Sequence, residues 1–274
     1  MSSVRAELML LRRRAATWVL LAIAILLSVF FSYLLPYLAY RSGSAASGLA
    51  PLLPDRLVST LLGGFPFYFG MLTLILGALA FGSEYGWGTL KTTLMQRSGR
   101  AHLLLAKLAA LGAVLVVFLV AVFAAGALSS VLIGLREGVA LLAPSPWDLA
   151  RGLAAGWLIL AVWALFGALL GVLSRGTALA IGVGILYGLV IEGIVAGFGE
   201  SIGLLHDLSR AFLRTNAYSL IVPLQTGSGP ASAGGPGAFS GPYLDASVAL
   251  LVILAYLVIF GGLSALLLAR RDVS

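Results

Sequence analysis

The sequence predicts an all-α membrane protein with six transmembrane helices, and its composition, mean hydropathy and spacing of charges support this fold class. Of the 274 residues, 61% are apolar and only 10% are charged. A soluble domain has about 45–50% apolar and about 25% charged residues. The mean hydropathy of +1.08 agrees with the membrane class. The composition argues against a soluble enzyme, a disordered chain and a disulfide-stabilised scaffold, and the chain contains no cysteine.

Six stretches between the charged residues are long enough to cross a bilayer, which takes about 20 mainly apolar residues. Only the fifth stretch contains a charged side chain, Glu192. The first stretch follows three arginines, but it is longer than the apolar core of a signal peptide, about 7–15 residues, so we predict a retained helix. The predicted spans cover residues 15–40, 57–83, 108–135, 152–174, 176–199 and 246–269.

The basic residues predict which side of the membrane holds the ends of the chain. Six spans leave both termini on one side, and eleven of the seventeen Lys and Arg residues then lie on that side. Because Lys and Arg accumulate in cytoplasmic loops, we predict cytoplasmic N- and C-termini and a cytoplasmic segment between the second and third spans. Residues 1–274 then form a single transmembrane domain, a multi-pass protein surrounded by lipid in the cell (cytoplasmic) membrane.

The largest predicted loop, residues 200–245, lies on the outer side between the fifth and sixth spans. Its first part, residues 201–224, has apolar side chains at nearly helical spacing. This spacing is typical of an interfacial helix, and equally of an amphipathic surface helix that only packs. The second part, residues 227–242, is rich in Gly, Pro, Ser and Ala, which predicts a flexible chain.

The motifs of several enzyme classes are absent from the sequence. Neither lysine, Lys91 or Lys107, belongs to a G-x-x-x-x-G-K-[ST] phosphate loop, so we expect no ATP site of that kind in this chain. His102 and His206 fall on opposite predicted sides and do not share a metal. No H-E-x-x-H or G-x-S-x-G motif is present. We therefore expect no catalytic residue, cofactor, metal or nucleic-acid partner for this chain.

Glu192 is the only acidic residue inside a predicted span. A charged side chain at the bilayer centre costs on the order of 3 kcal/mol, so such residues usually find a partner or face a cavity. Three interpretations stay open: a hydrogen bond to a neighbouring helix, a place on a transport path, and proton transfer. The first is the default for an intramembrane polar group.

The densest polar stretch, residues 81–107, lies between the second and third spans on the predicted cytoplasmic side. Trp87, Leu90 and Leu94 fall near one helical face, as is typical of a short helix at the membrane surface. A basic loop that only sets the topology has the same pattern, and the pattern alone favours this simpler interpretation.

The same stretch resembles the signature of the type-2 family of ABC exporter permeases. That signature has a Glu followed by an aromatic residue, then Gly-Thr-Leu-Lys/Arg, a Leu, an Arg, and a Lys that opens the third helix. The chain departs from it at the turn, where residues 97–100 read Arg-Ser-Gly-Arg. The six-span layout, Glu192 near the outer end of the fifth span, residues 215–217 and residues 270–273 are also similar to the family. The matching residues are Glu84, Tyr85, Gly88, Thr89, Leu90, Lys91, Leu94, Arg100 and Lys107.

The resemblance implies a permease subunit of an ATP-binding cassette exporter. Two such permeases, identical or related, are expected to pair and to bind two separate cytoplasmic ATPase subunits that hold ATP and Mg²⁺. Residues 84–100, including Arg97, are expected to contain a short coupling helix that contacts the ATPase. Two alternatives stay open from the residues alone: a secondary transporter coupled to protons or ions through Glu192, and a noncatalytic membrane scaffold. No motif identifies the substrate.

Overall fold

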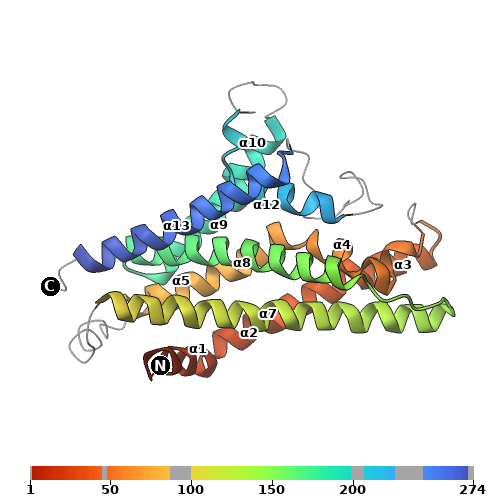
Figure 1. Cartoon of the computed structure of the whole chain (residues 1–274), viewed down its shortest axis with the longest axis horizontal. Helices are drawn as coiled ribbons and strands as arrows, with labels where there is room; N and C mark the ends of the chain where they lie inside the picture. Colours follow the sequence, from red (N-terminus) through yellow and green to blue (C-terminus); the bar gives the residue numbers. More distant parts are fainter. Residues whose placement is uncertain (1, 45–47, 87–99, 199–206, 226–242, 271–274) are drawn as a thin grey trace.

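The computed structural model describes residues 2–44, 48–86, 100–198, 207–225 and 243–270, and all structural statements below refer to these residues. Regular structure in these ranges is entirely helical, and the long helices run along one axis and pack side by side (Figure 1). Six helical runs are long and apolar enough to cross a membrane, which confirms the predicted number of spans. They cover Ala15–Arg41, Phe65–Ser83, His102–Glu137, Pro146–Ser174, Thr177–Val195 and Ala246–Leu267.

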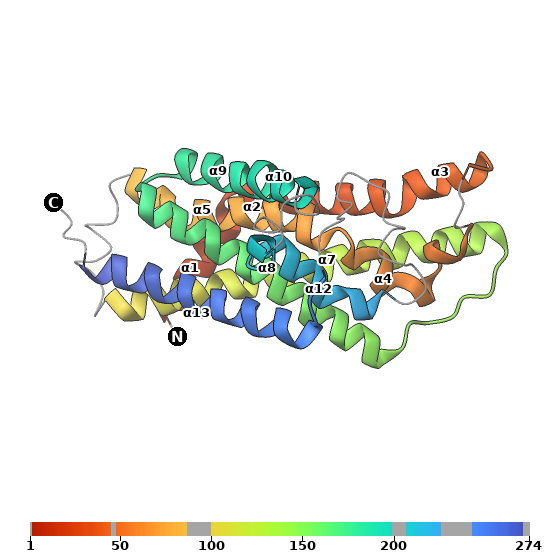
Figure 2. The same cartoon turned by 90° about the horizontal axis from the view of Figure 1, so that it is seen from above.

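The N-terminal residues form a helix of their own, which the hydropathy pattern does not predict. α1 (Ser2–Arg13) precedes the first span, and it runs across the direction of the long helices (Figure 2). It ends at Arg14, whose extended backbone (φ −75°, ψ 121°) separates it from α2 (Ala15–Leu27). Glu7 and Leu11, one helical turn apart, are buried. α1 therefore packs one face against the protein.

The first span consists of three consecutive helical pieces. After α2 the chain passes through the π-helical η1 (Ser28–Leu34) into α3 (Leu35–Arg41). In the first half of α3 the hydroxyl of Tyr37 donates a hydrogen bond of 2.6 Å to Oε1 of Glu137. Glu137 is the last residue of α7 (Arg100–Glu137), a helix of 38 residues. This contact joins the first and third spans at one end of the bundle.

The second span starts later than the predicted residues 57–83. The charge-free run is interrupted by Gly63, Gly64 and Pro66, because glycine disfavours a helix and proline lacks the N–H donor. The membrane-length helix therefore begins at Phe65, and the residues before the interruption form separate short helices. In order, the pieces are η2 (Ala50–Leu52), η3 (Pro54–Arg56), α4 (Leu57–Leu62), η4 (Phe65–Phe69) and α5 (Gly70–Gly86).

The last three spans agree closely with their predicted ranges. A tight turn joins the fourth to the fifth span, and Arg175 in this turn has a left-handed backbone (φ 54°) that ends the preceding helix. The fifth span contains a π-helical piece, as do the first and second. The helices are α8 (Pro146–Ser174), α9 (Thr177–Ile185), η5 (Leu186–Ile191), α10 (Glu192–Phe198) and α13 (Ala246–Arg270).

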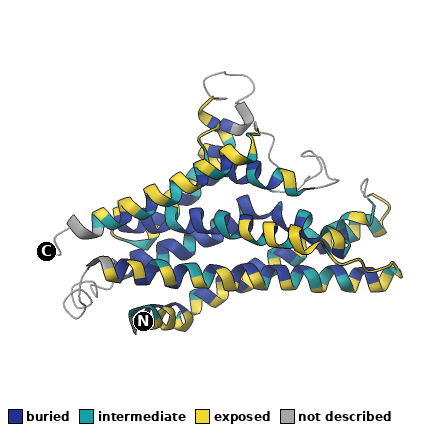
Figure 3. Ribbon diagram, viewed as in Figure 1, coloured by how far each residue is buried: buried dark blue, intermediate teal, exposed yellow. Residues whose placement is uncertain are grey.

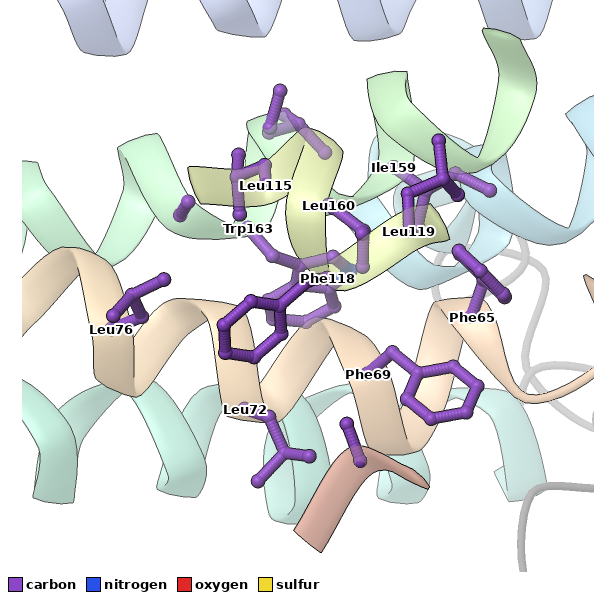
Figure 4. Close-up of a cluster of buried hydrophobic side chains, with 14 of the residues drawn as sticks. Phe65, Phe69, Leu72, Leu76, Leu115, Phe118, Leu119, Ile159, Leu160 and Trp163 are labelled. Carbon is purple, nitrogen blue, oxygen red and sulfur yellow. The ribbon is translucent and has the colours of Figure 1, made fainter. Parts of the chain in front are cut away.

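The core of the bundle lies between α5 and α8, and Trp163 of α8 is fully buried at its centre (Figure 4). Two glycines bring the backbones of these helices close together. Gly77 of α5 faces the carbonyl of Ala164, and Gly167 of α8 faces the carbonyl of Leu74. A Cβ atom at either glycine would overlap the facing backbone, so this contact requires glycine, as is common between membrane helices.

The spans differ in how far they are buried, and the difference separates central from peripheral helices. Within the apolar window of each span, 78% of the residues of the second span are buried, but only 22% of the first, 28% of the fifth and 17% of the sixth. Their exposed residues form the outside of the bundle along α2 and α13 (Figure 3). Because the exposed side chains are mostly apolar, these helices present a surface suited to lipid.

The later part of the predicted outer helix in residues 201–224 lies within the described residues, and the helix found there is not a surface helix. α12 (Leu213–Ile221) is followed by the 3-10 turn η6 (Val222–Leu224). Eight of the nine residues of α12 are buried, so the expectation of an amphipathic helix at the membrane surface is wrong for this part. α12 instead packs against α8, η4 and α13. The predicted flexible stretch, residues 227–242, lies outside the described residues.

The described helices nearest to the two chain ends, α1 and α13, reach the same end of the bundle. α1, the last turn of α5, the first turn of α7 and the C-terminal end of α13 meet there (Figure 1). Trp18 is 52% exposed in the first turn of α2, and Trp147 is 69% exposed in the first turn of α8, which starts at the other end. Exposed tryptophans are typical of the membrane–water interfaces. We call the end that holds α1 the terminal end.

Candidate functional site

The predicted coupling segment is attached directly to two spans at the terminal end. Glu84 and Tyr85 belong to the last turn of α5, and Arg100 is the first residue of α7. No flexible linker separates these residues from the second and third spans. A displacement of the segment would therefore act on two membrane helices at once. The other predicted coupling residues lie outside the described residues: Gly88, Thr89, Leu90, Lys91, Leu94 and Arg97.

Lys107, the residue that matches the family signature at the start of the third helix, forms a buried ion pair. Its Nζ atom lies 3.2 Å from Oε2 of Glu7, and the two side chains are only 7% and 5% exposed. The ammonium group also lies 5.8 Å from the ring centroid of Phe81 on α5, a favourable position for a cation above an aromatic ring. Lys107 therefore links α1, α5 and α7.

A second charged side chain of the N-terminal region bonds to α5. Nη1 of Arg14 donates a 2.7 Å hydrogen bond to the carbonyl of Leu79. The hydroxyl of Ser83 donates to the same carbonyl at 2.8 Å. Arg14 is the residue at which the chain bends between α1 and α2. We call Glu7, Arg14, Leu79 and Lys107 the inner cluster.

The Glu192 side chain binds the first turn of α12. The backbone N–H of Arg214 donates to both carboxylate oxygens of Glu192, at 3.2 Å each. Arg214 is the second residue of α12, so its N–H is one of the groups that has no acceptor within the helix. The residue before the helix, Phe212, supplies no side-chain cap. A carboxylate from the fifth span therefore takes the place of an N-cap side chain and complements the positive end of the helix dipole.

Tyr187 completes this contact from the same span as Glu192. Its hydroxyl hydrogen bonds to the Glu192 carboxylate, and it accepts a 3.5 Å hydrogen bond from the backbone N–H of Leu213. Tyr187 lies within the π-helical η5 (Leu186–Ile191), and Glu192, five residues later, is the first residue of α10. The i→i+5 spacing of a π-helix brings residues five positions apart close together, so both side chains reach the start of α12.

Further hydrogen bonds connect α12 and the residues before it with α13 and with residues that precede the second and sixth spans. Tyr218 donates to the carbonyl of Gly63 at 3.5 Å, and burial raises the pKa of this hydroxyl, which keeps it protonated as a donor. Tyr256 of α13 donates to the carbonyl of Ala211 at 2.6 Å, and the backbone N–H of Leu244 donates to Ser219 at 3.0 Å. α12 also packs against α8, η4 and α13, which belong to the fourth, second and sixth spans. We call Tyr187, Glu192, Leu213 and Arg214 the outer cluster.

The guanidinium of Arg214 packs on aromatic rings rather than facing water. It lies 5.2 Å from the ring centroid of Phe67 and 5.9 Å from that of Tyr218. Asn216, one of the residues that resemble the family, is fully buried, and its amide donates to the carbonyls of Arg210 and Phe212 at 2.8 Å each. These contacts fix the polar side chains of α12 inside the protein.

Of the three interpretations of Glu192, the geometry corresponds to the hydrogen bond to a neighbouring helix. The carboxylate is 2% exposed, and the backbone of α12 occupies both of its oxygens. The other two interpretations, a place on a transport path and proton transfer, stay predictions, because no contact of Glu192 in the described residues tests them. In the described residues, no three His, Cys, Asp or Glu side chains come close enough to hold a metal ion.

Several of these residues are not identifiable as partners from the sequence. Glu7 and Lys107 are 100 positions apart, and no periodicity relates them. Tyr187 is not identified because an i, i+5 pair falls on different faces of an α-helix. Glu7 does leave a signal in the sequence, since it is the one acidic residue within the arginine-rich and partly apolar residues 1–14. That signal marks Glu7 as unusual but does not point to its partner.

Comparison with known protein families relates most of the chain to one of them. The family model described as ABC-2 family transporter protein matches residues 3–191, which is more than half of the chain. The matched range contains the inner cluster and the predicted coupling segment, and it ends immediately before Glu192. No curated protein matches the chain significantly. The chain belongs to the ABC-2 family of transporter membrane proteins.

Proposed function

We propose that this chain is the permease subunit of an ATP-binding cassette exporter. It pairs with a second permease, identical or related, and with two separate ATPase subunits that bind ATP and Mg²⁺. The observation that carries the proposal is the match to the ABC-2 family over residues 3–191. The six membrane-length helices and the absence of a phosphate-loop motif from the sequence agree with a membrane subunit whose energy source lies on another chain.

In this proposal the terminal end of the bundle faces the cytoplasm. The excess of Lys and Arg on the side of the chain ends supports this orientation. Residues 84–100 then face the ATPase and contain the coupling helix. The termini and the coupling segment share one side, because an even number of spans returns the chain to the side where it began.

The packing of the spans supports a route from the coupling segment into the membrane. α5 and α7 continue from the two ends of the segment, and α5 is in close backbone contact with α8 through Gly77 and Gly167. A tightly packed contact does not deform smoothly, so a shift of α5 moves α8 with it. Closure of the two ATPase subunits around ATP would thereby rearrange the membrane helices.

The proposal is tested by ATP hydrolysis in a purified complex. The chain is co-expressed with a stand-alone ATPase from the same genome, and the complex is reconstituted in lipid vesicles. Glu84→Ala and Lys91→Glu are expected to abolish the stimulation of ATP hydrolysis by the permease while the chain stays in the membrane. Arg151→Glu is the matched control, because Arg151 is exposed near the start of α8, away from the terminal end.

Two results would contradict the proposal. One is unchanged hydrolysis in both coupling variants, and the other is a permease that copurifies with no ATPase. Flux that follows a pH gradient without ATP, and that Glu192→Gln abolishes, would instead establish the secondary transporter. A stable complex that transports nothing would instead support the noncatalytic membrane scaffold.

A further inference from the structure

α1 and the residue that follows it contact both helices that flank the predicted coupling segment. Glu7, in the middle of α1, pairs with Lys107 of α7 at 3.2 Å. Arg14, which follows α1, bonds to the carbonyl of Leu79 on α5 at 2.7 Å. The two contacts are therefore made at different points of the N-terminal region and on different helices. The N-terminal region bridges α5 and α7 at the terminal end.

The chemistry of these contacts makes them a defined attachment rather than general apolar packing. The Glu7 and Lys107 side chains are 5% and 7% exposed, so each supplies a counter-charge to the other in a buried setting. Leu11 is buried on the same face of α1 as Glu7. Arg5 and Arg12 are exposed, so the burial of Glu7 is specific to one side of the helix.

The bend at Arg14 fixes the direction in which α1 leaves the bundle. The extended backbone of this residue ends α1 and starts α2, and its side chain holds α5 at the same point. α1 is thus fixed near its middle by Glu7 and at its end by Arg14. A helix held at two points maintains the spacing between the elements that hold it.

We propose that α1 is a clamp that fixes the relative position of the inner ends of α5 and α7, and that Glu7, Arg14 and Lys107 are positioning residues for ATP-driven coupling. This inference rests on the proposed function for its coupling part, while the clamp itself is a statement about this chain alone. The clamp keeps the distance between the two ends of the coupling segment constant. A displacement of the segment by the ATPase therefore moves α5 and α7 together.

The clamp is tested by a distance measurement that needs no partner. The chain has no cysteine, so spin labels at Met9→Cys and His102→Cys report the position of α1 relative to α7; both residues are exposed. In lipid vesicles we expect one narrow distance distribution for the parent chain. Glu7→Gln and Lys107→Met are expected to broaden it, and Lys107→Arg, which keeps the charge, is expected to preserve it. Arg12→Gln, at an exposed position of α1, is the matched control.

The positioning role is tested on the complex with the ATPase, using MgATP as the probe. Glu7→Gln and Lys107→Met are expected to lower the stimulation of ATP hydrolysis on the order of tenfold, the size of a typical coupling between sites, while the ATPase still copurifies. Arg14→Gln should act in the same direction through α5, and it serves as an independent variant if a charge variant at Glu7 or Lys107 fails to insert. Lys107→Arg should keep the parent rate.

The two measurements separate the possible failures. An unchanged distance distribution in inserted Glu7→Gln and Lys107→Met overturns the clamp. A broadened distribution with an unchanged hydrolysis rate overturns the positioning role. Absence of stimulation in the parent complex overturns the proposed function, and the distance measurement still decides on the clamp.

Discussion

The inner and outer clusters each bury a carboxylate, but they neutralise it in different ways. Glu7 at the terminal end faces an opposite charge, Lys107. Glu192 in the fifth span is held by the backbone of Arg214 and by the hydroxyl of Tyr187, which carry no formal charge at the atoms that bond. An ion pair fails as soon as one partner is removed, whereas a carboxylate with several dipolar donors loses them one at a time. The inner cluster should therefore respond to mutation abruptly and the outer cluster gradually.

The two clusters also attach different kinds of helix. The inner cluster holds α1 across the ends of two spans, inside the range that matches the family. The outer cluster holds α12, a short buried helix, and Glu192 lies just beyond the matched range. The inner contacts therefore belong to the part of the chain that the ABC-2 family describes. The outer contacts belong mostly to the part that the family model does not cover.

The largest effect on stability is expected for Lys107→Met. This change removes a counter-charge from the buried Glu7, and breaking a buried pair in this way costs about 3–5 kcal/mol. The measurement is the thermal unfolding midpoint of the purified chain in detergent. A midpoint equal to that of the parent chain would show that Glu7 does not depend on Lys107.

The double variant Glu7→Leu with Lys107→Met is expected to recover most of that loss. Replacement of both charges by apolar side chains removes the desolvation cost together with the attraction, so the net change is often close to zero. The same unfolding measurement on both single variants and the double variant gives the coupling energy. Additive losses in the double variant would contradict a direct ion pair.

An intermediate effect is expected for Glu192→Ala. The change removes a charged acceptor from the start of α12, and a hydrogen bond to a charged group is worth about 1.5–3 kcal/mol. Glu192→Gln keeps one amide oxygen as an acceptor and should lose less. Hydrogen exchange of the α12 amides measures the effect locally, and equal protection in Glu192→Ala and the parent chain would be inconsistent with the cap.

A smaller effect is expected for Tyr187→Phe, which keeps the ring and removes one hydroxyl. The expected loss is about 0.5–1.5 kcal/mol, the net value of a single hydrogen bond. The readout is the unfolding midpoint together with exchange at Leu213. If Tyr187→Phe costs more than Glu192→Ala, the hydroxyl and not the carboxylate is the main support of α12.

The smallest effect is expected for Arg41→Gln, which serves as the exposed reference. Nη1 of Arg41 lies 3.4 Å from Oε1 of Glu137, but the arginine side chain is 55% exposed. Exposed pairs contribute about 0.2–1 kcal/mol and are screened by salt. An unfolding shift as large as that of Lys107→Met would remove the distinction between buried and exposed pairs on which the comparison depends.

The number of spans and most of their ranges are predictable from the sequence because the bilayer imposes a long apolar run on each helix. The start of the second span is not predicted correctly from charge alone, since Gly63, Gly64 and Pro66 interrupt an apolar run without adding a charge. A helix within residues 201–224 is predictable from the spacing of apolar residues, although most of those residues precede α12. The burial of α12 is not predictable, because it depends on contacts with three spans.

The candidate sites are predictable only in part for the same reason. The sequence singles out Glu192 as an intramembrane acid, but its partner is a backbone N–H on α12, and backbone groups leave no mark in a sequence. Lys107 is identifiable by resemblance, whereas its pairing with Glu7 is not, because that depends on how α1 folds across the bundle. Residues 87–99 lie outside the described residues, so the coupling contact stays a prediction.

The contact between the coupling segment and the ATPase can be measured directly by photo-crosslinking. The chain contains no cysteine, so a photoreactive maleimide at Lys91→Cys labels one site, and Arg151→Cys provides the control at the other end of the bundle. In the assembled complex we predict a crosslink to the ATPase from position 91 and none from position 151. A complex that crosslinks from position 151, or that remains intact without any crosslink from position 91, would contradict a permease driven through this segment.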